Sequence, residues 1–324
     1  MVSRDEVLGC YRFILGRDPE SEEVVREHLA ASSLAELRSS FIGSAEFQRI
    51  SGSIGAAAPD IDACLPPQVW QANPVDCEAT PEQLVVLLDR IRREWEGFGK
   101  TEPHWSVLTH DNYRQDAIAG NIEEFYASGM FVANIIKAFF ERHGLEPAKL
   151  RNCFELGCGV GRITIHLARL FDSVVGADIS KFHLDVCREE LGRRRVRNVE
   201  LLCLDSPARL EALSEIRFFC SFIVLQHNPP PVITYILDTV LARLGAGGAA
   251  VFQVPTWRRG YAYDLDAYLR RPKRLHMEMH VLPQAHVHRI IARNGCRLLE
   301  LREDGWAEGR TAATISNTFF VVRD

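Results

Sequence analysis

Three features are missing from this 324-residue sequence, and each disfavours a class of protein. No run reaches the ~18 apolar residues that a membrane-spanning helix needs, and residues 1–12 hold no long apolar core of the secretory kind. The nine cysteines form no Cys-x-x-Cys pair, which is typical of reduced thiols in a cytosolic protein. The net charge of −5 disfavours a nucleic-acid binder, which is normally basic. We therefore expect a cytoplasmic protein with no membrane span and no nucleic-acid partner.

The length and composition predict a globular chain of two or three units, with 47% hydrophobic and 25% charged residues. Residues 1–51 are predicted to form a small helical module, because Ser3 with Glu6 and Ser33 with Glu36 have the spacing of capping boxes. Residues 52–79 are rich in Gly, Ala, Ser and Pro, which predicts a linker.

Residues 80–145 are predicted to be mainly helical. Thr80 and Gln83 have capping-box spacing, and Pro81 suits the first turn of a helix. An apolar stripe at helical spacing follows, and Gly97 is expected to end this first helix.

The stretch 153–171 combines a short apolar run, a glycine loop and an amphipathic helix. Gly157, Gly159 and Gly161 stand at alternate positions, where glycine lets the backbone turn sharply and approach a ligand closely. The following helix presents its positive N-terminal end to that ligand. A dinucleotide fingerprint would need a glycine where the chain has Arg162, so the spacing indicates a different cofactor.

Strand and helix patterns alternate through the rest of the chain. The predicted strands are residues 153–156, 173–180, 198–205, 217–225, 247–255, 296–303 and 313–323. Such alternation predicts an α/β fold with a parallel, doubly wound sheet covered by helices on both faces.

Together with Glu155, the loop has the pattern E-x-G-x-G-x-G, which resembles motif I of the class I S-adenosylmethionine-dependent methyltransferases. The resemblance covers roughly residues 110–324. It implies a Rossmann-like methyltransferase domain at 146–324, with a seven-stranded, mostly parallel sheet whose last strand is antiparallel. It also implies S-adenosyl-L-methionine as cofactor, S-adenosyl-L-homocysteine as product, and a helical lid at 80–145 that folds over the cofactor.

The first module has a resemblance of its own. Its sequence resembles a bacterial helical domain of unknown function, which has an LGR-P turn and a closing S-x-EF. The matching segments are YRFILGRDP and LAELRSSFIGSAEFQ. Such modules are often fused to enzymes that build surface polysaccharides. The resemblance implies a glycan context. Because the module has its own capping and apolar pattern and is followed by the predicted linker, we expect it to position a protein partner or a substrate polymer.

The methyltransferase resemblance assigns roles in cofactor binding. Asp178, at the tip of the second strand, is expected to hold the ribose hydroxyls, and Glu155 to orient the loop and the cofactor's amino group. Asp205 is expected to bind the adenine amino group, or else to cap the helix beginning at Pro207. The predicted cofactor set is Glu155, Gly157, Cys158, Gly159, Gly161, Arg162, Asp178, Ile179, Leu204, Asp205, Leu225 and Gln226.

The methyl acceptor is expected after the fourth strand. The motif VLQHNP resembles one found in small-molecule and glycan methyltransferases, in which the histidine lies at the mouth of the acceptor pocket. His227, with an ordinary pKa near 6.5, would suit a base that assists transfer to a sugar hydroxyl, or it only caps or packs. Asn228-Pro229-Pro230 matches the start of the signature of amino-methyltransferases, but Pro231 replaces the aromatic residue that grips the amine.

The later histidines allow two further interpretations. His276 and His280 have the i,i+4 spacing of a metal pair, but no H-E-x-x-H pattern or cysteine accompanies them, so no catalytic metal is expected. His280 is instead a secondary catalytic candidate that contacts the acceptor.

Further acceptor-binding candidates flank the core. They are Tyr113, Arg114 and Tyr126 before the glycine loop, and Trp257, Arg258 and Tyr261 after the fifth predicted strand. The latter three belong to a stretch rich in arginine and aromatic residues, which suits an acidic or phosphorylated acceptor or else a solvated basic surface.

The sequence therefore predicts a methyltransferase that methylates a hydroxyl of a sugar, glycan or glycan precursor in polysaccharide biosynthesis. Two alternatives stay open. One is N- or O-methylation of a small secondary metabolite, and the other is a cofactor-binding scaffold without catalysis.

Overall fold

The computed structural model describes residues 2–15, 17–49, 73–271, 277–307 and 313–324. The chain divides into two compact units, residues 1–70 and 71–324. None of the helices in these described ranges is long and apolar enough to cross a membrane.

The first unit is a small helical bundle. Its elements are α1 (Arg4–Cys10), the π-helical turn η1 (Tyr11–Leu15), α2 (Glu22–His28) and α3 (Leu34–Ile42). Tyr11 and Phe41 pack edge to face in its core, with ring centroids 4.8 Å apart. The predicted box of Ser3 and Glu6 is present. At α3, Ser33 accepts the Glu36 N–H, but the Glu36 carboxylate bonds Ser32 instead of Ser33.

The second unit is built on one seven-stranded sheet in the order β3-β2-β1-β4-β5-β7-β6. All neighbouring pairs are parallel except those of β7, which is antiparallel to β5 and β6. The predicted sheet is confirmed. The strands are β1 (Asn152–Leu156), β2 (Ser173–Asp178), β3 (Val199–Cys203), β4 (Ile216–Ser221), β5 (Leu244–Arg258), β6 (Cys296–Asp304) and β7 (Thr314–Arg323).

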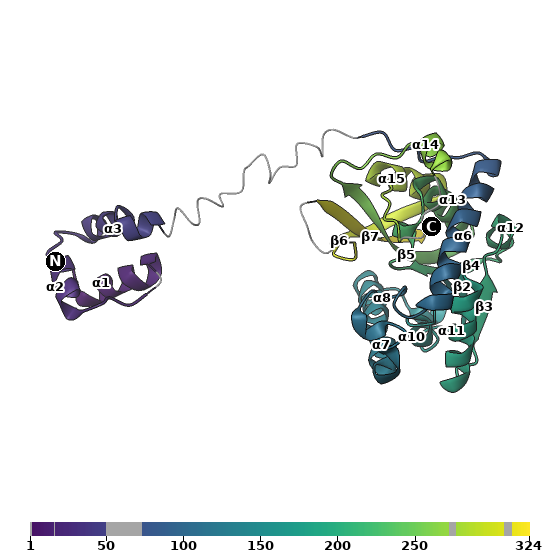
Figure 1. Ribbon diagram of the computed structural model, residues 1–324, viewed down its shortest axis with the longest axis horizontal. Coiled ribbons are helices and arrows are strands. Elements are labelled where there is room, and N and C mark those ends of the chain that lie inside the picture. The colour runs from purple at the N-terminus through teal and green to yellow at the C-terminus, as the bar shows by residue number, and fades with distance from the viewer. Residues whose placement is uncertain (1, 16, 50–72, 272–276, 308–312) are drawn as a thin grey trace. The chain divides into compact units, whose positions relative to one another are not determined.

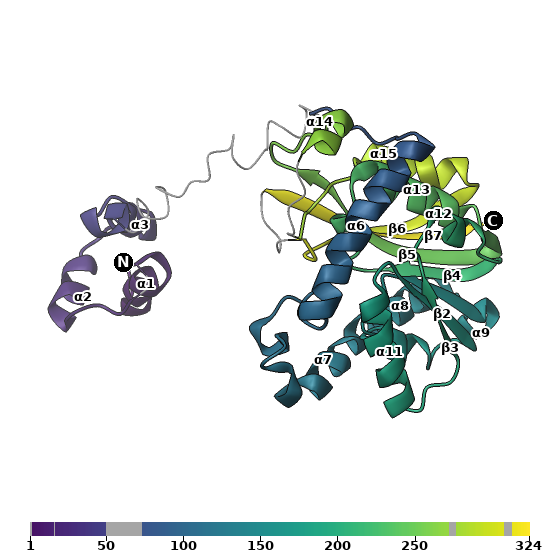
Figure 2. The ribbon, with the colours of Figure 1, turned by 45° about the vertical axis from the view of Figure 1, so that its right-hand side comes forward.

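Helices cover both faces of the sheet (Figures 1 and 2). Successive residues of β4 show why: Phe218 packs into the cluster under α8, and Phe219 into the cluster under α6, α13 and α15. The remaining elements are α6 (Pro81–Thr101), η3 (Asp111–Tyr113), η4 (Ile118–Gly120), α7 (Ile122–Ser128), α8 (Met130–His143), α9 (Pro147–Leu150), α10 (Thr164–Leu167), α11 (Lys181–Arg193), α12 (Pro207–Glu211), η5 (Leu225–His227), α13 (Pro230–Leu241), α14 (Leu265–Arg270) and α15 (Gln284–Arg293).

The long helix α6 differs from its prediction at one end. It starts with the expected capping box at Thr80 and Gln83, but it continues through Gly97 to Thr101. A Cβ at Gly99 would lie 2.6 Å from Ser180 Oγ and 2.9 Å from His183 Nδ1. Packing against α11 therefore overrides the local tendency of glycine to end the helix.

Most of the predicted linker, 52–72, lies outside the described residues. Its last part does not behave as a free linker, because it contacts the core. Val75 forms a parallel bridge with Tyr263, and the Asp76 carboxylate accepts the Leu265 N–H at 2.8 Å.

Candidate active site

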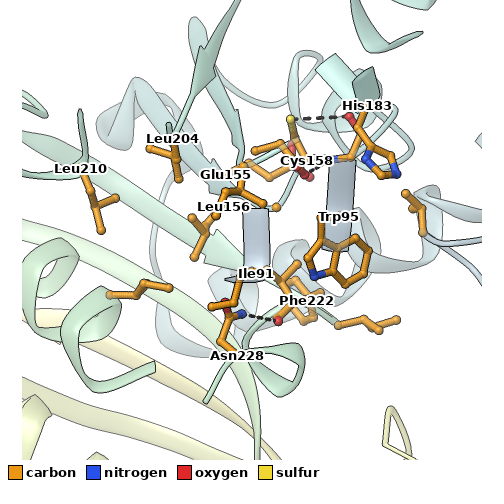
Figure 3. A pocket seen from close by; sticks show the side chains of 18 of the residues that line it. Ile91, Trp95, Glu155, Leu156, Cys158, His183, Leu204, Leu210, Phe222 and Asn228 are labelled. Carbon is orange, nitrogen blue, oxygen red and sulfur yellow. Dashed lines mark hydrogen bonds between the residues drawn. The ribbon is translucent and has the colours of Figure 1, made fainter. Parts of the chain in front are cut away.

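A pocket opens at the carboxyl ends of β1, β2 and β4, with α6 across it (Figure 3). Parallel α/β sheets place ligand sites at this edge, where the strand order reverses. The glycine loop and the segments after β2, β3 and β4 line it, together with side chains of α6 and α13.

The glycine loop has a left-handed backbone at each predicted glycine: φ is 73° at Gly157, 53° at Gly159 and 89° at Gly161. L-residues with a side chain rarely adopt this conformation, which explains the alternate glycines. The Gly157 N–H donates to the Ala177 carbonyl at 2.7 Å, which ties the loop to β2. The space beside Gly159, which we expected to serve the cofactor, is occupied by Val107.

Asp178 stands at the end of β2 in the pocket wall, where the ribose site was predicted. One carboxylate oxygen accepts the Gly159 N–H at 2.9 Å, and the other accepts the Ser180 N–H at 2.8 Å. Ser180 caps α11, as expected, by accepting the His183 N–H. Asp178 therefore fixes the glycine loop and also presents a carboxylate to the pocket.

Glu155 and Arg162 are buried charged residues that line the same part of the pocket. Glu155 accepts the Thr164 hydroxyl at 2.6 Å, and burial raises the pKa of its carboxyl to about 7. Arg162 donates to Ser128 Oγ at 3.3 Å, while its buried Nε has no hydrogen-bond partner among the described residues. A buried guanidinium N–H without a partner is costly, so this end of the pocket suits a ligand with a carboxylate and an ammonium group.

Another part of the pocket wall, the apolar slot, consists of apolar side chains. Its walls are Ile179 and Leu204 from the ends of β2 and β3, Leu210 of α12, Ile91 of α6 and Ile236 of α13. A slot of this kind suits a flat ring, which agrees with the predicted roles of Ile179 and Leu204.

Asp205 lies beside the slot and not in the described wall. Its side chain is about half exposed and forms an ion pair with Arg209 at 3.5 Å. It does not cap α12, because the N-cap residue of that helix is Ser206. The capping alternative for Asp205 is therefore wrong, and its contact with adenine stays a prediction.

The segment after β4 forms the side of the pocket where an acceptor was predicted. Phe222, Ile223, Val224 and Asn228 line it. Leu225 and Gln226 are buried beside it, with exposed fractions of 0% and 3%. The amide nitrogen of Asn228 donates to the Val224 carbonyl at 2.8 Å, which leaves its side-chain oxygen available to a donor in the pocket.

His227 stands behind the pocket wall. Its ring centroid lies 5.4 Å from that of Trp95, which does line the pocket. Because a carbonyl oxygen only accepts, the 2.9 Å contact with the Glu278 carbonyl places the proton on His227 Nδ1. Nε2 then accepts from the Gln226 amide at 3.3 Å. Burial lowers the pKa of His227 to about 4, which corrects the ordinary value assumed for a base.

His280 has both ring nitrogens engaged. Nε2 lies 3.0 Å from the Glu278 carboxylate, and Nδ1 lies 3.0 Å from the Tyr261 hydroxyl. The Tyr268 hydroxyl also donates to Glu278, at 2.6 Å. His280 is thus buried in a polar network beside the pocket, and its predicted pair, His276, lies outside the described residues. Within the described ranges, His, Cys, Asp and Glu side chains form no group of three that could hold a metal ion.

The other acceptor candidates are not gathered at the pocket. Tyr113 and Tyr126 are buried around Phe125, and the Tyr126 hydroxyl donates to the Val160 carbonyl of the glycine loop at 3.0 Å. Arg114 stacks on Trp105 at 4.7 Å. Trp257 and Arg258 continue β5, where they pair with Ile315 and Thr314.

Residues 80–145 contribute side chains to the pocket wall, none of which was predicted as a site residue. Trp95, Ser106 and Val107 line the wall, and Ser106 Oγ lies 2.8 Å from Nε2 of His183, another wall residue. Trp95 continues the apolar stripe of α6 and so resembles an ordinary core residue. No pattern in the sequence separates it from its neighbours on that stripe.

Parts of this chain are similar to known methyltransferases. A family model described as a methyltransferase domain matches residues 154–248. A tRNA/tmRNA (uracil-C(5))-methyltransferase from a Nitratiruptor species is 32% identical over 65 residues. That segment is 20% of this chain and spans 18% of the length of the relative.

Solved structures match over a longer range. Magnesium protoporphyrin IX methyltransferase from Synechocystis PCC 6803, with bound SAH, has a TM-score of 0.50 and 17% identity, covering 72% of this chain and 98% of that one. The N-methyltransferase NodS from Bradyrhizobium japonicum WM9 has a TM-score of 0.44 and 15% identity, with coverages of 72% and 98%.

The second unit therefore has the fold of the class I methyltransferases. Residues 154–248, the segment that matches the methyltransferase-domain model, carry the glycine loop and the ends of β2 and β4.

Proposed function

We propose that this chain transfers a methyl group from S-adenosylmethionine to a hydroxyl of a sugar, glycan or glycan precursor. The observation that carries the proposal is the pocket at the glycine loop, which combines three separate kinds of surface. They are the Glu155 and Arg162 charges, the Asp178 carboxylate and the apolar slot. S-adenosylmethionine has three parts that suit these surfaces, namely an amino acid, a ribose and an adenine.

In this proposal each surface holds one part of the cofactor. Arg162 Nε would donate to the carboxylate, and Glu155, once ionised, would pair with the ammonium group. Asp178 would accept from the ribose hydroxyls, and Leu204 would contact the adenine ring. The bound cofactor supplies an electrophilic methyl group on its sulfonium.

The acceptor would approach along Phe222, Ile223 and Asn228. These residues would hold the acceptor hydroxyl beside the methyl group that S-adenosylmethionine supplies, with S-adenosylhomocysteine left as product and the hydroxyl proton passing to water. Alignment and exclusion of water by the side chains across the pocket would supply most of the rate. His227 would orient this wall and not act as the base, because it is hydrogen-bonded at both nitrogens and its pKa is lowered to about 4.

The glycan class of acceptor is supported by the resemblance of residues 1–51 and by the basic, aromatic stretch after β5. Arg270 and Arg271 of that stretch are exposed, while Lys273 and Arg274 lie outside the described residues. Guanidinium groups pair well with phosphate or carboxylate, so we propose an acidic or phosphorylated acceptor.

N- or O-methylation of a small metabolite is the second candidate, and one observation is compatible with its N-methylating form. Asn228, and not His227, lies in the pocket wall, with its amide nitrogen already used by Val224. The remaining oxygen could accept from an amine N–H.

A two-part experiment tests the proposal. Calorimetry with S-adenosylhomocysteine asks whether the full chain binds the cofactor product, and the Gly159→Val variant serves as the non-binding control. A mass-spectrometric screen of sugars, nucleotide sugars, lipid-linked glycans and amines then asks which acceptor gains a methyl group. A folded protein that does not bind the product would reject the methyltransferase, and a methyl gain confined to amines would reject the glycan acceptor. Binding without methylation of any acceptor would leave the non-catalytic scaffold.

A further inference from the structure

The chain after β4 bends where its sequence favours a straight strand. Residues 217–225 are almost entirely apolar or β-branched, yet β4 ends at Ser221. The bend is at Ile223, whose φ is 59°. A β-branched residue in the left-handed region is strained, and such a conformation persists only where surrounding contacts hold it.

The contact at Ile223 comes from Gln253, in the middle of β5. Its side-chain oxygen accepts the Ile223 N–H at 3.0 Å. Its amide nitrogen donates to Gln226 Oε1 at 3.1 Å and to Ser316 Oγ at 2.7 Å. Gln253 is fully buried, and this set of partners uses both ends of its amide in a single orientation.

The bend has a direct consequence at the glycine loop. Val224, the next residue, fills the space that the missing side chain of Gly157 leaves open, because a Cβ there would lie 2.3 Å from Val224 Cγ2. Ile223, Val224 and Gly157 all line the pocket, whereas Gln253 lies in the sheet beneath. The packing of Val224 against the glycine loop therefore depends on the backbone conformation of Ile223.

We propose that Gln253 is a positioning residue of the pocket: it holds Ile223 in the left-handed conformation and thereby sets Val224 against Gly157. Gln253 acts through the backbone of another residue and does not touch the ligand. The inference rests on the proposed function only in its choice of S-adenosylhomocysteine as the binding probe.

A double-mutant cycle tests this inference on the full chain. It compares wild type, Gln253→Met, Ile223→Gly and the combined variant by calorimetry with S-adenosylhomocysteine and by melting temperature. Gln253→Met should weaken binding about tenfold, the equivalent of one buried hydrogen bond. In the Ile223→Gly background the same change should alter affinity by about twofold or less, because glycine adopts the left-handed conformation without help.

Thr256→Val is the matched control. Thr256 lies on the same strand, and its hydroxyl bonds Asn317 of β7 at 2.5 Å, away from Ile223. It should lower the melting temperature and leave affinity unchanged. Equal loss of affinity from Gln253→Met in both backgrounds, or an equal loss in Thr256→Val, would overturn the inference.

Two further results are informative. If Gln253→Met does not fold, a combined variant that folds and binds the probe supports the inference. If neither Gln253→Met nor the combined variant folds, while Ile223→Gly alone does, the inference is overturned. If wild type does not bind the probe, the proposed function fails. The positioning role is then judged by whether Ile223→Gly reduces the drop in melting temperature that Gln253→Met causes.

Discussion

The glycine loop and the segment after β4 both line the pocket, and both bend through left-handed residues. At Gly157 and Gly159 the bend is a property of glycine itself. At Ile223 it opposes the preference of the residue and depends on a hydrogen bond from a different strand. Two walls of one site are therefore specified in different ways, one by local sequence and the other by tertiary contacts.

The largest effect is expected in the locally specified wall. Gly159→Val should abolish binding of S-adenosylhomocysteine, because a β-branched residue is strained at φ 53° and its Cβ would lie 2.6 Å from Val107 Cγ2. Gly120→Val is the control, since nothing lies within 4 Å of a Cβ at Gly120. Calorimetry that found wild-type affinity in Gly159→Val would show that this wall does not depend on glycine.

Asp178→Ala should have the next largest effect. Loss of hydrogen bonds to a charged group costs about 1.5–3 kcal/mol, so affinity should fall tenfold or more. The melting temperature should fall as well, because the carboxylate also holds Gly159 and Ser180. Asp205→Ala is the comparison for stability, because replacing this half-exposed acid should change the melting temperature little. Unchanged affinity in a folded Asp178→Ala protein would reject the ribose assignment.

Because of Glu155, we expect the affinity for S-adenosylhomocysteine to depend on pH. Its carboxyl has a pKa of about 7 when folded, so it is largely protonated at pH 6 and ionised at pH 8. An ammonium group of the ligand favours the ionised form, and affinity should therefore rise about tenfold between these two pH values.

Glu155→Gln isolates this effect. Glutamine keeps the size and an acceptor for Thr164 but does not titrate. Affinity in this variant should not vary between pH 6 and 8. A wild-type affinity that is equally independent of pH would place the ligand's ammonium group away from Glu155.

The smallest effect is expected at His227. With its pKa lowered to about 4, the imidazole is neutral throughout pH 6–9, so turnover at saturating S-adenosylmethionine should be flat there and should decline only below about pH 5. His227→Gln, which can still hydrogen-bond, should retain most of the activity. His227→Ala should lose about tenfold, the equivalent of one hydrogen bond. An equal loss of ~10²–10⁴-fold in both variants would instead identify His227 as the base.

Much of the fold could be predicted because its signals are local. The alternation of apolar strands with amphipathic helices indicated the parallel sheet, and the capping box at Thr80 indicated the start of α6. The end of α6 could not be predicted in this way. Gly97 is a local stop signal, and the packing of Gly99 against α11 overrides it.

The candidate site divides along the same line. Glu155 and Asp178 could be named because each has a fixed place relative to a strand end and the glycine loop, and both lie in the pocket wall. Tyr113 and Tyr126 were named by residue type, and their rings proved to be buried in an aromatic cluster. Ser106 and His183 were missed because their contact joins segments that are 77 residues apart.

The sequence alone determined the glycine loop, the acids beside it and the alternation of strands with helices, since each depends on conformational preferences within a few residues. Only the tertiary structure decided where β4 ends, which side chains close the pocket and how far the pKa of His227 falls. Those properties depend on burial and on hydrogen bonds between distant strands, as at Ile223 and Gln253, where a contact across the sheet outweighs the preference of the residue itself.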